Sequence, residues 1–208
     1  MAFAHKYNED GGVAVTYMGD GAANQGQNAE CYNMAALWKL PVLYVIENNQ
    51  YGMGTKVDRA VGLKDFSGRA KSFGLNTVHI TTLDVEEAYF KAKPIIEDAR
   101  NGKPGFIEIE CYRFYGHARM DKSLYREEKE EKKGRKEDPI TFAKNKLINN
   151  KLLTIQQIYQ LDLVISNEMD KAMNLGQSKL GWLSLIGGLL GCTIGISLQE
   201  WVSQIQYP

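Results

Sequence analysis

Short apolar runs alternate with amphipathic stretches along most of this chain. The apolar runs are rich in β-branched or aromatic residues and have the length of strands; they cover residues 13–18, 42–46, 77–80 and 106–111. The stretches between them carry apolar residues at helical spacing or helix-end signals; they cover residues 25–38, 65–74 and 84–100. Strands that alternate with helices in this way predict an α/β fold, a parallel sheet flanked by helices.

Additional helices are predicted before and after this pattern. They cover residues 2–8, 139–148 and 154–173, with Asp138 and Thr154 as N-terminal caps. We therefore divide the chain into three parts: a partial α/β domain at 1–125, a charged linker with C-terminal helices at 126–173, and a divergent, apolar, glycine-rich tail at 174–208.

One strand–helix–strand unit, residues 13–54, holds the polar residues that suggest chemistry. Asp20 directly follows its first strand and Asn49 its second. The connection suits two parallel strands, whose carboxyl ends meet at one edge of the sheet, where open α/β sheets bind ligands. A carboxylate and an amide oxygen at one crevice suit Mg²⁺, which completes its shell with phosphate oxygens and water. Gly21 and Gly26 permit close backbone approach, so a metal-bridged diphosphate is the expected ligand.

Two motifs in this unit resemble a known cofactor signature. Gly19-Asp20-Gly21, followed further along by Asn48-Asn49, is similar to the thiamin diphosphate motif. The longer segments GDGAANQGQ, YNMAALWKLP and ENNQYGMGT resemble the alpha subunit of the dehydrogenase component of 2-oxo acid dehydrogenase complexes. The resemblance implies a thiamin diphosphate-binding fold, thiamin diphosphate and Mg²⁺ as cofactors, and a chain that begins within a domain.

The resemblance also implies a set of site residues. Those expected to contact the cofactor are Gly19, Asp20, Gly21, Ala22, Asn49, Tyr51, Gly52, Met53 and His117. Asp20 and Asn49 are expected to bind the metal through side-chain oxygens, and Tyr51 through its backbone oxygen. His117 is the expected catalytic residue, because an imidazole can donate a hydrogen bond to the diphosphate end or to the incoming substrate.

The activity that the resemblance implies is decarboxylation of a small 2-oxo acid and transfer of the acyl group to a lipoyl-bearing acyltransferase. A beta subunit, in a heterotetramer, would supply the glutamate that activates the cofactor, so we expect the isolated chain to be inactive. The segments AANQGQ and YGMGT favour pyruvate, whereas Tyr115-Gly116-His117 is compatible with acetoin or branched-chain enzymes. A further alternative is a truncated relative that binds the beta subunit without catalysis.

Composition and charge argue against other classes of protein. The chain has 25 Lys and Arg against 25 Asp and Glu, so it presents no basic field for nucleic acid. The charged run at 126–138 contains both signs and predicts a solvated helix or linker with local ion pairs. The scattered Cys31, Cys111 and Cys192 indicate a reducing compartment, no zinc site, and ordinary buried thiols.

Three ring side chains are interpreted as structural. Tyr32 and Trp38 lie in the stretch predicted as the crossover helix, and we expect both in the core. His79 alternates with apolar neighbours in a predicted strand and receives no functional role.

The two ends of the sequence bear on localisation. Residues 1–7 lack the basic region, apolar core and cleavage site of a secretory signal, so we expect a bacterial cytoplasm, a mitochondrial matrix or a plastid stroma. Near the other end no charge lies between Lys179 and Glu200, a length that could cross a bilayer. Its glycines lower its hydrophobicity, and we favour an altered terminus over a membrane tail or a partner-buried helix.

Overall fold

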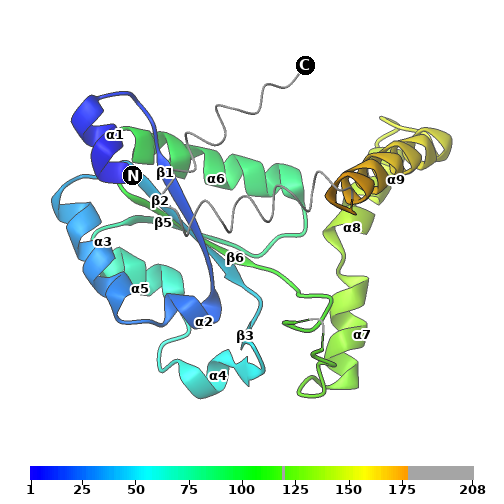
Figure 1. The fold of residues 1–208 in the computed structure, drawn as a ribbon, viewed down its shortest axis with the longest axis horizontal. Coiled ribbons are helices and arrows are strands. Elements are labelled where there is room, and N and C mark those ends of the chain that lie inside the picture. Colours follow the sequence, from blue (N-terminus) through cyan, green and yellow to red (C-terminus); the bar gives the residue numbers. More distant parts are fainter. Residues whose placement is uncertain (119, 178–208) are drawn as a thin grey trace. The chain divides into compact units, whose positions relative to one another are not determined.

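A four-stranded parallel sheet forms the centre of the fold (Figure 1). The computed structural model describes residues 1–118 and 120–177, and the chain divides into two units, 1–145 and 146–208, which are treated separately. The sheet belongs to the first unit and has the strand order β1-β2-β6-β5. Its strands are β1 (Ala14–Gly19), β2 (Val42–Asn48), β5 (Asn76–Ile80) and β6 (Gly105–Glu110). The predicted α/β fold with a parallel sheet is therefore confirmed.

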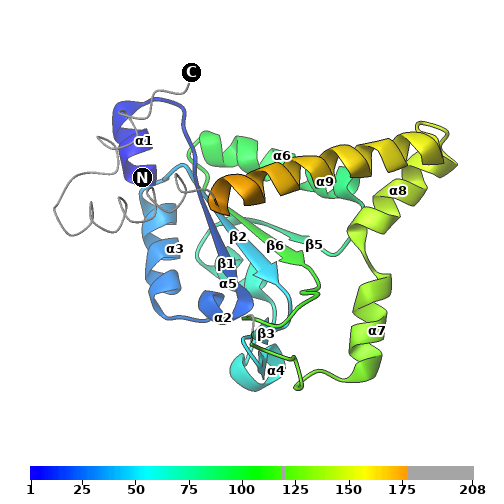
Figure 2. The same ribbon diagram turned by 45° about the vertical axis from the view of Figure 1, so that its right-hand side comes forward.

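The strand register places the ends of β1, β2 and β6 beside one another. Gly19 of β1 pairs with Glu47 of β2, and Asn48 of β2 pairs with Glu110 of β6. All these pairings are parallel, so the three carboxyl ends share one edge (Figure 2). The segments that leave this edge are the ones predicted to carry the functional residues.

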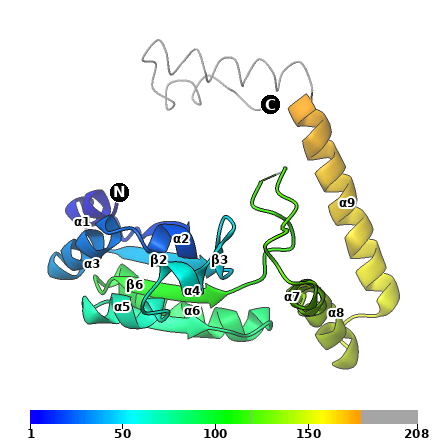
Figure 3. The ribbon, with the colours of Figure 1, turned by 90° about the horizontal axis from the view of Figure 1, so that it is seen from below.

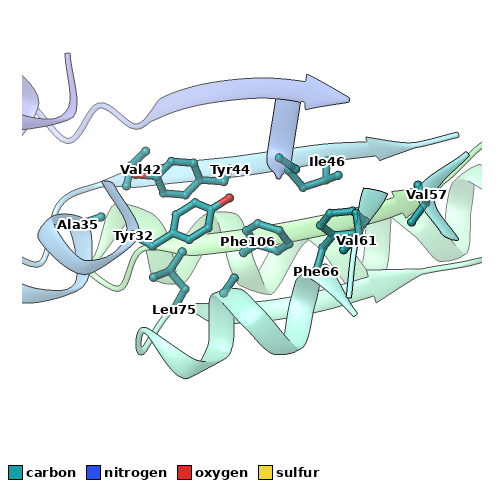
Figure 4. Packing of buried hydrophobic residues seen from close by; sticks show 12 residues of the cluster. Tyr32, Ala35, Val42, Tyr44, Ile46, Val57, Val61, Phe66, Leu75 and Phe106 are labelled. Atoms are coloured by element: carbon teal, nitrogen blue, oxygen red, sulfur yellow. The ribbon is translucent and has the colours of Figure 1, made fainter. Parts of the chain in front are cut away.

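Helices α3 (Gln27–Leu37) and α5 (Phe66–Ser72) pack on one face of the sheet. The Tyr32 ring of α3 stands edge-on to Tyr44 at a centroid distance of 4.8 Å and to Phe106 at 5.7 Å (Figure 4). Phe66 of α5 is 1% exposed in the same cluster. Aromatic contacts of this kind add to the stabilisation from apolar burial, so this layer holds the crossover helix firmly on β2 and β6.

Helix α6 (Val85–Arg100) covers the other face of the sheet. It begins where predicted, because the Asp84 side chain accepts a hydrogen bond from the Glu86 N–H at 3.0 Å. Its Ile95 packs in a buried cluster with Leu43, Val45, Ile80 and Ile107 of the sheet. The two helical layers leave β2 and β6 buried on both sides, as in other parallel sheets.

Six further elements of the first unit lie at the two ends of the sheet, most of them at its carboxyl edge. They are α1 (Ala2–Asn8), α2 (Asp20–Ala23), β3 (Tyr51–Gly52), β4 (Thr55–Lys56), α4 (Val57–Ala60) and α7 (Glu128–Lys136). Of these, α1 lies at the opposite end, where Lys6 donates to the Trp38 carbonyl. Figure 3 shows α2 and β3 together at the end of the sheet toward which the strands point.

Helix α8 (Pro139–Asn149) crosses from the first unit into the second, and α9 (Ile155–Gln177) follows. Thr154 caps α9 as predicted: its N–H donates to Gln157 Oε1 at 2.9 Å and its hydroxyl accepts from the Gln157 N–H at 3.3 Å. No helix within the described residues is both long enough and apolar enough to span a bilayer. The apolar segment predicted near the carboxyl terminus lies outside the described residues.

Several burial predictions were wrong. Trp38 is 44% exposed, because α3 turns Tyr32 and Ala35 toward the sheet and ends before Trp38. Cys31 is exposed because it precedes Tyr32 and faces away from the sheet, and Cys111 is exposed because it lies just beyond the end of β6. His79 is a satisfied structural residue, as predicted, with Nε2 3.0 Å from Glu110 Oε1.

Candidate functional site

Asp20 is a buried carboxyl group at the end of β1. The strand ends at Gly19 and the chain turns at once into the single-turn helix α2, which draws Asp20 inward and leaves it 1% exposed. Its Oδ1 atom is buried and has no hydrogen-bond partner within the part of the chain that the structure describes. Burial raises the pKa of Asp20, an effect that the Asn49 N–H and the Arg113 guanidinium partly oppose.

Asn49 stands next to Asp20 because β2 ends beside β1. Its backbone N–H is close enough to lower the pKa of the Asp20 carboxyl. Its side-chain oxygen accepts a hydrogen bond from the Tyr51 N–H at 3.3 Å, which is long for such a bond. The side chain is half-buried, and this oxygen keeps acceptor capacity for a ligand.

The segments that carry Asp20 and Asn49 touch through two glycines. A Cβ built on Gly21 would stand 3.0 Å from the Gly52 Cα, and one built on Gly52 would stand 3.2 Å from the Gly21 Cα, so a side chain at either position would crowd the backbone of the other segment. Ala22, the next residue, accepts from Asn28 Nδ2 at 2.7 Å and ties α2 to α3. A Cβ on Gly26 would meet nothing within 4 Å, so within the described residues no close contact requires that glycine.

Arg113 holds the backbone of the β3 region. Its Nη2 donates to the Met53 carbonyl at 2.9 Å, and its Nη1 approaches the Tyr51 carbonyl at 3.4 Å. Met53 has a left-handed φ of 56°, and its side chain is 65% exposed. The Tyr51 oxygen predicted to bind the metal therefore faces a guanidinium group, and its role as a ligand stays a prediction.

His117 lies in a loop organised by Asp121. The Asp121 carboxylate accepts from the Tyr125 hydroxyl at 2.7 Å and from the His117 N–H at 2.7 Å. Hydrogen bonds from Tyr125, the Ser123 N–H and the His117 N–H lower the pKa of Asp121 to about 2. The His117 side chain itself is exposed, so the loop fixes its backbone while its imidazole faces solvent. Its catalytic role stays a prediction.

Arg126 is buried, which corrects the prediction of a fully solvated charged run. Its guanidinium lies 5.0 Å from the Tyr51 ring centroid and 4.8 Å from the Tyr112 ring centroid. Arg126 Nη1 donates to the Arg113 carbonyl, while Nε and Nη2 have no partner among residues 1–118 and 120–177. Most other side chains of the run are exposed, and local ion pairs form as predicted, for example Lys132 with Glu128, whereas Gly134 is buried.

The two arginines were the functional candidates that the sequence analysis missed. Arg113 and Arg126 flank a loop that leaves the carboxyl end of β6, and that position was the available signal. Neither stands out in the sequence, because Arg113 lies among aromatic residues and Arg126 begins a run of charges.

The residues at this edge fit a divalent cation with a phosphorylated ligand. Asp20 offers a buried carboxylate oxygen without a partner, and Asn49 offers an amide oxygen close by. No group of three or more His, Cys, Asp or Glu side chains within the described ranges could hold a metal ion by itself. Two oxygen ligands from the protein suit Mg²⁺, which takes the rest of its six ligands from phosphates and water.

A cavity of about 450 Å³ adjoins Asn49 at the same edge. Its lining includes charged side chains, with Lys56 and Lys133 as well as Glu110 and Glu130. Charges of both signs line it, which favours a polar occupant over an apolar one. We assign no ligand to this cavity, but it leaves the edge of the sheet accessible beside Asn49.

Comparison with family models gives two matches. The model described as "Dehydrogenase E1 component" matches residues 1–180, which include the whole sheet and every residue of the candidate site. The model described as "Alternative complex III, ActD subunit" matches residues 163–208. The first match supports the resemblance expressed by the motifs, and the second covers mainly residues outside those that the structure describes.

Three relatives, from two bacteria and a marsupial mitochondrion, are named as the same subunit. "Pyruvate dehydrogenase E1 component subunit alpha" from Rhizobium meliloti (strain 1021) is 41% identical over 180 residues, 86% of this chain and 52% of the relative. The protein of that name from Zymomonas mobilis is 45% identical over 150 residues, 71% of this chain and 42% of the relative. A mitochondrial one from Sminthopsis macroura is 41% identical over 176 residues, 83% of this chain and 48% of the relative. The chain thus spans about half the length of these relatives.

Proposed function

Because the chain belongs to the dehydrogenase E1 component family, we propose that it is the alpha chain of a thiamin diphosphate-dependent 2-oxo acid dehydrogenase acting on pyruvate. The observation that carries the proposal is the buried Asp20 Oδ1 beside Asn49, an atom that has no hydrogen-bond partner among the described residues. A buried acceptor without a partner costs about 1–3 kcal/mol, a cost that a bound cation would remove.

The proposal assigns a role to each residue at this edge. Asp20 and Asn49 would bind Mg²⁺ through their side-chain oxygens, with Tyr51 as a further ligand through its backbone oxygen. Gly19, Gly21, Ala22, Gly52 and Met53 would form the surface against which the diphosphate and aminopyrimidine portions lie. The Gly21–Gly52 contact supports this, because it holds two segments that are distant in sequence side by side at this edge of the sheet.

Thiamin diphosphate, when bound, supplies the electron sink that allows a 2-oxo acid to lose carbon dioxide. The chain's own contribution is binding and electrostatics. The Asp20 carboxylate would hold the cation that neutralises the diphosphate, and the Arg113 guanidinium adds positive charge near the same carboxyl. The exposed imidazole of His117 would donate a hydrogen bond to the substrate or the diphosphate.

Partners and compartment also belong to the proposal. A beta subunit would complete the active site in a heterotetramer, and a lipoyl-bearing acyltransferase would accept the acetyl group. The relatives include bacterial proteins and a mitochondrial one, which supports a bacterial cytoplasm or an organellar matrix. The names of the relatives support pyruvate over acetoin or a branched-chain 2-oxo acid.

A binding and reconstitution experiment tests this function. The purified chain is titrated with Mn²⁺ and thiamin diphosphate by electron paramagnetic resonance, and then assayed for carbon dioxide release from pyruvate with a beta subunit present. We expect binding by the chain and activity only with the beta subunit. Asp20→Asn is the matched control, because it keeps the shape of the side chain and removes its charge. Equal Mn²⁺ binding by both forms would refute the proposed site.

A further inference from the structure

Glu108 is a buried carboxylate in the middle of the sheet that the proposed function does not use. It lies on β6 with its side chain 2% exposed, on the face covered by α5. Three donors point at it: Asn48 Nδ2 at 2.8 Å, the Ser67 N–H at 3.0 Å and the Ser67 hydroxyl at 3.0 Å. His79 Nε2 approaches the same carboxylate at 3.9 Å. Burying such a group is costly, and these contacts offset that cost.

The hydrogen bonds continue from Glu108 to the segment that carries Asn49. Asn48 is 3% exposed, and its side-chain oxygen accepts from the Gln50 N–H at 3.3 Å and from Gln50 Nε2 at 2.8 Å. Gln50 has a φ of 69°, a left-handed conformation that a residue with a side chain rarely adopts. Asn48 therefore ties down Gln50, the strained residue that follows Asn49.

The carboxylate of Glu108 determines which way the Asn48 amide points. A carboxylate can only accept hydrogen bonds, so the Asn48 nitrogen must face Glu108 and its oxygen must face Gln50. In the reverse orientation the Asn48 oxygen would face the Glu108 carboxylate, so two acceptors would meet. The Asn48 nitrogen would then face the two nitrogens of Gln50, so donors would meet donors. In the contacts from Gln50 through Asn48 to Glu108, each donor and each acceptor is therefore fixed by the carboxylate.

We propose that Glu108 is a positioning residue: it orients Asn48, which holds the turn at residues 48–50 and thereby aims the Asn49 side chain at the edge of the sheet. Glu108 is not one of the residues proposed to bind the ligand, and it acts through Asn48 and Gln50. The consequence for metal binding rests on the proposed function, whereas the effect on the turn does not. The inference therefore has one consequence that is independent of any cofactor.

Glu108→Gln tests the inference with almost no change in volume. A glutamine that turns its oxygen to Ser67 must present its nitrogen to the Asn48 nitrogen, and a flip of Asn48 would deprive the Gln50 N–H of its acceptor. By amide hydrogen exchange followed by nuclear magnetic resonance, we expect exchange at the Gln50 N–H to become about tenfold faster. An unchanged Gln50 rate, with exchange at Val45 also unchanged, would overturn the inference.

The double variant Glu108→Gln with Asn48→Asp supplies the rescue. The glutamine nitrogen can donate to the new carboxylate, and that carboxylate can still accept from both nitrogens of Gln50, so every donor again has an acceptor. We expect the Gln50 exchange rate to return close to its original value. A general loss of stability would not be repaired by the second substitution, so failure of rescue also counts against the inference.

Ser67→Ala is the control on the other side of Glu108. It removes the hydroxyl donor from α5 but leaves the bond to Asn48 in place. We expect no change in Gln50 exchange. If the parent chain binds Mn²⁺, Glu108→Gln should weaken that binding about tenfold and the double variant should restore it. Altered and rescued exchange in a chain that binds no Mn²⁺ would refute the proposed function while supporting Glu108 as the residue that positions the turn.

Discussion

Gly21 and Gly52 lie in backbone contact across the candidate site, with the Cβ position of Gly21 only 3.0 Å from the Gly52 Cα. Gly21 belongs to α2, which follows β1, and Gly52 belongs to β3, which follows β2. Adjacent parallel strands bring the two segments to the same edge, and the absence of side chains at both positions lets them meet. The separation of Asp20 and Asn49 therefore depends on this contact.

Gly21→Ala is expected to push α2 and β3 apart. The obstacle is backbone rather than a flexible side chain, so the two segments must shift, at a cost of about 1–3 kcal/mol typical of overpacking. We expect urea unfolding to show that loss and Mn²⁺ titration to show weaker binding. Gly26→Ala is the matched control, because a Cβ there meets nothing within 4 Å and its φ of −58° suits alanine. Equal effects of the two substitutions would contradict the argument.

Asp20→Asn is expected to stabilise the metal-free protein at neutral pH. Burial raises the pKa of this carboxyl, so the folded state favours the protonated form and the ionised form at neutral pH reduces stability. Removing the charge should therefore raise the free energy of unfolding at neutral pH. The gain should vanish below about pH 4, where the carboxyl is protonated in both folded and unfolded chains. Urea unfolding at both pH values, without metal, measures this difference.

Metal affinity should increase as Asp20 ionises, whereas the stability of the metal-free protein should decrease. A cation competes with the proton for Asp20, and a raised pKa means that protonation interferes at a higher pH than for an ordinary aspartate. We expect Mn²⁺ affinity to rise as pH increases through the Asp20 pKa and to level off above it. Isothermal titration calorimetry should also detect proton release in this range. An affinity independent of pH in the acidic range would show that Asp20 is not a ligand.

The strands and helices around the sheet could be predicted from local pattern, whereas the strand order β1-β2-β6-β5 was not predicted. The apolar strands and the caps at Asp84 and Thr154 are local signals, and each corresponds to an observed element. Asp20 and Asn49 could also be predicted to lie together, because parallel strand ends share an edge whatever the side chains do. For these two residues the sequence pattern and the strand pairing both place the side chains at one edge of the sheet.

Contacts between residues distant in sequence could not be predicted in this way. Arg126 lies in a run of charges, yet it is buried because the rings of Tyr51 and Tyr112 enclose it. Glu108 belongs to an alternating strand, and nothing local shows that Ser67 would meet it across the sheet face. Burial of these charges depends on partners many residues away, so periodicity carries no information about it.

Tyr32, Tyr44 and Tyr51 should resist ionisation until strongly alkaline pH. Burial raises the pKa of each of these phenols to about 12, and for Tyr51 the hydrogen bond to Glu130 at 2.8 Å adds to the shift. The unfolded chain ionises near pH 10, so the stabilisation is complete below about pH 10 and is lost as pH rises toward 12. Ultraviolet titration of tyrosinate should show a late group of tyrosines that disappears on unfolding. Ionisation of all tyrosines near pH 10 in the folded protein would contradict the burial of these three phenol groups.

Arg126→Ala is expected to destabilise the first unit by about 2 kcal/mol. The substitution removes two cation–π contacts, each about 0.5–1 kcal/mol or more when desolvated, together with the bond to the Arg113 carbonyl. Relief of the unpaired Nε and Nη2 offsets part of this loss. Lys129→Ala, at an exposed position of the same charged run, should change stability by less than about 0.5 kcal/mol. Urea unfolding of both variants checks the contrast, and a similar small effect of each would mean that Arg126 is solvated in solution.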